Sequence, residues 1–121
     1  MISAHGAEIP VMGFGTSGLG RSAAETVAIA RVELIYPFAK QQLTELIASY
    51  PNLKEVVWVQ EEPRNMGCWK VMGRRLPDLL PEGVTLDYVG RPTRASPGEG
   101  YSIAHAREQE RIVLTALTPG A

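Results

Sequence analysis

The sequence predicts an α/β domain in which helices cover both faces of a largely parallel sheet. Three observations lead to this three-layer fold class. A β-branched run over 27–35 is followed by a segment with helical spacing, and a second strand-like run, 55–60, is apolar on both faces. The alternation of strands and helices then continues to the last helix. Alternating elements of this kind form three-layer domains, and strands buried on both faces are typical of parallel sheets.

The size and composition are those of one ordinary globular domain. The chain has 121 residues, of which 45% are hydrophobic and 21% charged, and its formal net charge is −1. A chain of this length can bury one hydrophobic core without help from a metal or a disulfide. A net charge near zero creates no long-range attraction to nucleic acid or to an anionic membrane, so we expect neither as a partner.

The single cysteine, Cys68, has no second cysteine in the chain with which to form a disulfide. No secretory signal is recognised in residues 1–20, and no apolar run reaches the roughly 20 residues that a membrane-spanning helix needs. We therefore expect a cytoplasmic protein.

The first firm element is a strand over 27–35 that ends at Tyr36-Pro37. Pro37 is predicted to open the next helix, because its missing N–H costs nothing in a first turn. The helix covers 38–50, where apolar residues recur at positions i, i+3, i+4 and i+7. These residues are Leu43, Leu46, Ile47 and Tyr50.

The second half of the chain continues the alternation of strands and helices. We predict a strand over 55–60, a helix over 66–76, a strand over 85–89, a loop over 90–100 and a last helix over 102–117. The candidate core residues of the last helix are Ile103, Ala106, Ile112, Val113 and Leu117.

The most informative segment joins the strand over 55–60 to the helix that follows it. The strand stops at Gln60-Glu61-Glu62-Pro63, and Arg64-Asn65-Met66-Gly67-Cys68-Trp69 opens the next element. This run resembles the C-terminal domain of the 2-oxoglutarate dehydrogenase E1 component, and the similarity extends over about 26–117. Further blocks follow the family in the same order. They are Ala30-Arg31-Val32-Glu33-Leu34-Ile35-Tyr36-Pro37-Phe38, Tyr88-Val89-Gly90-Arg91-Pro92, Ala95-Ser96-Pro97, and Gly100-Tyr101 before a helix with His105 and Glu108-Gln109.

The resemblance implies a transketolase C-terminal-like fold that packs against the remaining E1 domains and the E1 dimer partner. It implies a parent reaction of the tricarboxylic acid cycle, the oxidative decarboxylation of 2-oxoglutarate with succinyl transfer to the lipoyl carrier of an E2 partner. The thiamine diphosphate and magnesium of that enzyme are then held elsewhere, because no Gly-Asp-Gly motif with a following Asn-Asn pair occurs here. We therefore expect no catalytic residue, no metal and no cofactor bound by this chain alone.

Three regions are predicted along the chain: a variable Gly/Ala/Ser-rich segment over 1–25, the E1-like domain over 26–117 and a tail over 118–121. Within residues 1–19, the run Gly6-Ala7-Glu8-Ile9-Pro10-Val11-Met12-Gly13-Phe14-Gly15-Thr16 resembles the N-terminus of an aldo/keto reductase. The catalytic residues of that family have no counterparts here, so no activity is carried over. In packing terms, 9–14 is a candidate substitute for the first strand of the domain.

A glycine motif in the same segment suggests a second function class. Residues 13–18 spell G-x-G-x-x-G, and Glu33 lies 20 residues beyond Gly13, where a ribose-binding acid belongs. The helix between them would have to fit within 19–28, which is short for a crossover. A flexible glycine turn is the favoured interpretation, and an NAD(P)-binding reductase fragment is an alternative.

Six residues are assigned to interface or loop roles. Glu61 and Glu62 follow the end of a strand, where α/β domains place functional loops. The adjacent Pro63 and Arg64 favour a fixed turn and an ion pair across an interface over a general acid. A lone histidine also favours an interface over a metal site. The six residues are Glu61, Glu62, Arg64, Asn65, Trp69 and His105.

A basic set forms the candidate effector site. Lys70 and Arg74 lie at i and i+4 on one helical face, and Arg91 and Arg94 follow the next strand. The resemblance implies acetyl-CoA or an adenine nucleotide as the ligand, because some bacterial family members respond to these molecules. A solvated basic face is the more ordinary interpretation. A stand-alone acetyl-CoA or nucleotide-binding module is therefore the other alternative function.

Overall fold

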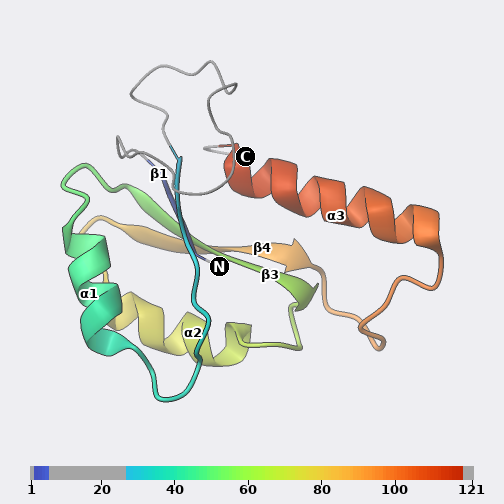
Figure 1. Ribbon diagram of the computed structural model, residues 1–121, viewed down its shortest axis with the longest axis horizontal. Coiled ribbons are helices and arrows are strands. Elements are labelled where there is room, and N and C mark those ends of the chain that lie inside the picture. Colours follow the sequence, from blue (N-terminus) through green and yellow to red (C-terminus); the bar gives the residue numbers. More distant parts are fainter. Residues whose placement is uncertain (1, 6–26, 119–121) are drawn as a thin grey trace.

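The computed structural model describes residues 2–5 and 27–118, with helices on both faces of a four-stranded sheet (Figure 1). The strands are β1 (Ile2–His5), β2 (Val27–Ala30), β3 (Glu55–Pro63) and β4 (Thr85–Arg91). The helices are α1 (Lys40–Ala48), α2 (Trp69–Arg75) and α3 (Ser102–Leu117), with a short 3₁₀ helix, η2 (Leu76–Leu79), after α2. The α/β class and its three layers are confirmed, and the last helix has the predicted bounds.

The sheet is mixed, with strand order β2-β1-β3-β4. Strands β3 and β4 are parallel, and β1 is antiparallel to both β2 and β3. Only one of the three pairings therefore has the parallel direction that the sequence predicts for most of the sheet. The helical crossover from β3 through α2 to β4 fixes the direction of that pair. The sequence pattern predicts no helical crossover that would set the direction of β1. The strand expected at 9–14 lies outside the described residues.

Strand β3 is the centre of the core because both of its faces are covered. Val56 and Trp58 lie in the cluster formed with α1 and α2, whereas Val57 and Val59 lie in the cluster formed with α3. Side chains alternate between the two faces of a strand, so consecutive apolar residues serve both layers. This confirms the interpretation of 55–60 as a strand buried on both faces.

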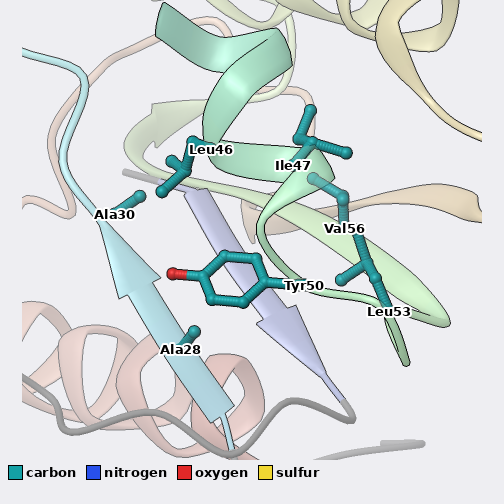
Figure 2. A pocket seen from close by; sticks show the side chains of 7 residues that line it. All are labelled: Ala28, Ala30, Leu46, Ile47, Tyr50, Leu53 and Val56. Atoms are coloured by element: carbon teal, nitrogen blue, oxygen red, sulfur yellow. The ribbon is translucent and has the colours of Figure 1, made fainter.

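The face of the sheet toward α1 and α2 has the larger cluster. Met72 and Leu76 are completely buried in it. Figure 2 shows Ala28 and Ala30 of β2 facing Leu46 and Tyr50, and these small side chains leave a narrow apolar gap beneath α1. The buried members are Ala28, Leu43, Ile47, Leu53, Val56, Trp58, Met72 and Leu76.

The opposite face is covered by α3, and here the predicted core is largely wrong. Of the five candidates only Ile112 is buried, and it packs with Ala116 against β3 and β4. Ile103 is 68% exposed and Val113 is 45% exposed. The error arose because α3 has apolar residues on two sides, and periodicity alone does not show which side meets the sheet.

The segment after β2 differs from the prediction in length. The strand ends at Ala30, residues 31–39 are irregular, and helix α1 begins at Lys40. Pro37 is therefore not a first-turn residue of the helix, because it lies three residues before Lys40. Helix α2 likewise begins at residue 69, after a turn in which Gly67 has φ of +65°.

Candidate functional site

The turn that follows β3 is organised around one buried amide, that of Gln60. Its Oε1 accepts hydrogen bonds from Trp58 Nε1 at 2.9 Å and from the backbone N–H of Trp69 at 3.1 Å. Its Nε2 donates to the carbonyl oxygens of Pro63 and Met66 at 3.1 and 2.9 Å. Gln60 is only 8% exposed, so these contacts satisfy a group whose burial would otherwise be costly. One side chain thereby fixes the path of 60–69.

Gly67 lets the turn close on this amide. A Cβ at this position would lie 3.1 Å from Gln60 Oε1 and 3.1 Å from the carboxyl carbon of Glu62, and the positive φ is unfavourable for other residues. The glycine of the Met-Gly-Cys-Trp run is therefore required by close approach as well as by backbone conformation.

Arg64 leaves this turn and stacks on two aromatic rings. Its guanidinium carbon lies 5.0 Å from the ring centroid of Tyr88 and 5.6 Å from that of Trp69, and the two rings are 5.1 Å apart. The Tyr88 hydroxyl lies 2.9 and 3.1 Å from the carbonyl oxygens of Arg91 and Glu62. Burial raises the pKa of Tyr88, which keeps this hydroxyl protonated as a donor.

Gly90 makes room for the Tyr88 ring. A Cβ at position 90 would lie 2.3 Å from the Tyr88 hydroxyl oxygen and 2.9 Å from the carbonyl oxygen of Gln60. The glycine of the Tyr-Val-Gly-Arg-Pro block is therefore explained by the lack of space for a larger side chain at position 90.

Arg91 holds the loop after β4. Its side chain is 3% exposed, and its Nε donates to Glu99 Oε1 at 2.8 Å. It also donates to the carbonyl oxygen of Glu61 and lies 3.4 Å from His105 Nδ1. Arg94 pairs with the other Glu99 oxygen. The hydrogen bond from Arg94 lowers the pKa of Glu99 below its ordinary value, so the carboxylate stays charged between the two guanidinium groups.

Helix α3 joins this network through its inner face. Glu108 lies 3.6 Å from Arg94 and 2.7 Å from Arg111, and Arg111 donates to the carbonyl oxygen of Gly90 at 2.9 Å. Gln109 Nε2 donates to Glu61 Oε1 at 3.2 Å. Polar contacts thus connect α3 with the ends of β3 and β4.

The residues predicted for interface or loop roles converge at this end of the sheet. Asn65 exchanges two hydrogen bonds with the backbone of Arg94, at 2.9 and 3.1 Å. Glu61 contacts Arg91 and Gln109, Arg64 stacks on Trp69, and His105 lies beside Arg91. Glu62 is exposed, and its carbonyl oxygen accepts a hydrogen bond from the Tyr88 hydroxyl.

The structure divides the predicted effector set. Arg91 and Arg94 meet at Glu99, so both have a carboxylate partner. Lys70 and Arg74 are exposed on α2, where Arg74 Nε donates to the Lys70 carbonyl oxygen. Within 27–118, no hydrogen bond or ion pair joins these two residues to Arg91 or Arg94.

An open cleft lies beside the end of β4 instead. Two arginines line it, Arg64 from the turn and Arg111 from α3, together with one carboxylate, that of Glu108. The remaining lining residues are Tyr88, Gly90, Pro92 and Thr93.

Sequence reasoning missed four residues of this end of the sheet: Gln60, Tyr88, Glu99 and Arg111. The spacing of Glu108 and Arg111 at i, i+3 is a usable signal for an ion pair. No local pattern identifies Glu99, because its partners come from β4 and from the loop five residues earlier.

The described residues contain no cluster of potential metal ligands. No three His, Cys, Asp or Glu side chains among them converge as a metal site would require. Cys68 is a free, partly buried thiol. Nor does the described part of the chain contain a helix with the length and apolar character to cross a membrane.

Comparison with known proteins decides the family. The family model described as 2-oxoglutarate dehydrogenase C-terminal matches residues 19–117. The chain belongs to this family. The match confirms the resemblance found in the sequence, and it includes β2, β3, β4 and all three α-helices.

Relatives from several bacteria share about half of their aligned residues with the chain. The 2-oxoglutarate dehydrogenase E1 component of Geobacillus kaustophilus (strain HTA426) is 49% identical over 114 residues, with 87% of this chain and 12% of the relative covered. The E1 components of Bacillus subtilis (strain 168) and Shouchella clausii (strain KSM-K16) are 52% and 53% identical, and cover 78% and 76% of this chain. The chain spans only 10–12% of the length of these three relatives.

Proposed function

We propose that the chain acts as the C-terminal structural and regulatory domain of a 2-oxoglutarate dehydrogenase E1-like subunit and is not catalytic by itself. Its proposed partners are the remaining E1 domains, the E1 dimer partner and the lipoyl-bearing E2. The parent enzyme would decarboxylate 2-oxoglutarate and transfer the succinyl group, with thiamine diphosphate and magnesium held by other domains.

One observation carries this proposal. The polar side chains at the carboxyl end of β3 and β4, where α/β domains place reactive groups, are used to hold the domain's own turns. Gln60 is surrounded by backbone partners, and Arg91 is paired with a buried carboxylate. Such an arrangement builds a rigid surface on which other domains can pack, and the exposed Arg64 and Glu62 are suited to that contact.

A rescue experiment tests this role. A Bacillus subtilis E1 component truncated before its own C-terminal domain is mixed with the full chain, thiamine diphosphate, magnesium and 2-oxoglutarate, and carbon dioxide release is measured. We expect activity only in the mixture, reduced at least fivefold by Arg64→Ala. Lys54→Ala is the matched control, because Lys54 is an exposed cation at the opposite end of β3. Turnover by the chain alone, or no docking detected by sedimentation, would contradict the proposal.

The cleft at Arg64 and Arg111 favours a second proposal, the binding of acetyl-CoA or an adenine nucleotide. Two guanidinium groups offset by one carboxylate leave a positive charge in the cleft, which suits a phosphate group. Isothermal titration of the chain with acetyl-CoA tests it, with Arg111→Gln and Lys70→Gln compared. Loss of heat in the first variant alone supports the cleft, loss in the second alone supports the original basic set, and no heat with the wild type rejects both.

A further inference from the structure

The side of α3 that faces away from the sheet, its outer face, exposes large apolar residues beside charged ones. It consists of Ile103, Arg107, Glu110 and Leu114, spaced by four, three and four residues, so these side chains share one side of the helix. Ile103 is 68% exposed and Leu114 is 58% exposed. This side is opposite to Ile112 and Ala116, which contact the sheet. The helix therefore has a second face, with two large apolar side chains at its ends and two charged ones between them, that no described residue covers.

The spacing of this outer face is that of a helix that packs against another helix. Side chains that alternate in steps of three and four residues form the narrow seam of a coiled-coil contact. Val113 is 45% exposed at one flank, and Leu117 is only partly buried. The 16 residues of α3 make a seam of about 24 Å at 1.5 Å per residue.

The charges at the middle of the seam indicate what covers it. Arg107 and Glu110 are both exposed, and neither has an ion-pair partner within 27–118. If two copies of α3 lie antiparallel, Arg107 of each faces Glu110 of the other, and Ile103 of each faces Leu114 of the other. A parallel arrangement would instead bring Arg107 beside Arg107 and Glu110 beside Glu110. Charge complementarity therefore selects the antiparallel, two-fold symmetric pair.

We propose that the outer face of α3 is a self-association surface, on which a second copy of this chain packs its own α3 antiparallel. Each contact then occurs twice across the two-fold axis, which doubles both the apolar and the ionic pairs. One helix pair is small beside the roughly 1,600 Å² of a standard stable interface, so we expect a reversible dimer with a dissociation constant on the order of micromolar. This surface is separate from the cleft at Arg64 and does not depend on the role proposed above.

Sedimentation velocity of the full chain from about 1 to about 500 µM measures this equilibrium. We expect conversion from monomer to dimer across the range. Ile103→Lys and Leu114→Lys should each raise the dimer dissociation constant at least tenfold, because they place two further cations in the seam. Glu82→Lys is the matched control, since it changes an exposed side chain in the turn before β4. Unchanged circular dichroism confirms that the variants are folded.

A charge exchange tests the antiparallel register. Arg107→Glu and Glu110→Arg should each weaken the dimer threefold or more, because each places like charges opposite one another. The double variant should return the dissociation constant to within about twofold of wild type, because the pairs re-form with reversed sign. A chain that is monomeric at every concentration overturns the proposal, as does a dimer unaffected by Leu114→Lys. Failure of the double variant to recover rejects the antiparallel pair. Loss of docking to truncated E1 through Leu114→Lys, without a dimer, assigns the surface to another domain and also overturns it.

Discussion

The two faces of the sheet are covered to very different extents. On one face α1, α2 and η2 enclose eight buried residues, with a further ring of partly buried ones. On the other face the cluster has five buried residues, two from α3 and three from β3 and β4. Figure 1 shows the two sides, with α1 and α2 below the sheet and, among the described helices, α3 above it.

The two faces also differ in the kind of contact that holds their helices to the sheet. The α1 and α2 side has the enclosed packing of a protein interior, with Met72, Leu76 and Val56 fully buried. The α3 side depends more on polar contacts, because Arg91, Glu99 and Glu108 connect the helix and its loop to the sheet. Among the described residues, nothing covers Ile103 and Leu114 on the outer face of α3.

The largest expected effect compares the same kind of deletion on the two faces. Leu76→Ala should lower the free energy of unfolding by about 4 kcal/mol and Ile112→Ala by about 2 kcal/mol, because the enclosed site relaxes less around a cavity. Chemical denaturation of both variants at low protein concentration measures the difference. An equal or larger loss for Ile112→Ala would show that the two faces are equally complete.

A somewhat smaller effect is expected at the turn that joins β3 to α2. Gln60→Leu should cost about 2–3 kcal/mol, because the indole N–H of Trp58 and the backbone N–H of Trp69 lose their buried acceptor. Thermal denaturation measures the loss. The matched control is Gln41→Leu, which removes an exposed side-chain hydrogen bond and should change stability by less than about 0.5 kcal/mol. Equal effects at the two positions would rule out the role of Gln60 as the organiser of this turn.

The smallest expected effect is a pH dependence on the α3 side. The pKa of Glu99 is lowered in the folded state, so its stabilising contribution is present above the ordinary value of 4.5 and is lost as the pH falls through the lower folded-state pKa. The melting temperature of Glu99→Gln should therefore lie below that of the wild type at pH 7, and the gap should narrow below about pH 4.5. Glu82→Gln is the control. A gap that is constant from pH 7 to the acid range would show that Glu99 does not act as a charge.

The strong periodic patterns predicted most of the fold. The strand at 55–60 follows from its run of residues that are apolar on both faces, and the helix at 102–117 from its spaced apolar residues. Both are present, and β3 continues to Pro63. No sequence pattern predicted β1, whose place and direction depend on pairing between residues distant in sequence. The apolar residues at 31–35 predict a strand, whereas in the structure Val32 and Ile35 pack against the core from an irregular segment. Burial without a strand produces the same apolar signal.

The candidate site shows a similar division. The Gln-Glu-Glu-Pro run correctly located the end of β3, and its neighbours Arg64, Asn65 and Trp69 do meet there. Helical spacing grouped Lys70 with Arg74, and charge added Arg91 and Arg94 to them. The structure separates the two pairs, because Arg91 and Arg94 share the carboxylate of Glu99. Of the outer residues of α3, only Ile103 was among the predicted core residues, and the structure leaves it 68% exposed.

The central claim is that the α1 and α2 side is fully packed within one chain, whereas α3 packs against a second copy of the chain. Hydrogen exchange on the full chain at low and high protein concentration tests it. We predict that the exchange rates of the amides of 40–48 and 69–75 are equally slow at about 5 and about 500 µM. The amides of 102–117 should exchange faster at about 5 µM than at about 500 µM. Equal exchange of α3 at both concentrations, or concentration-dependent protection of α1 in its place, would contradict the claim.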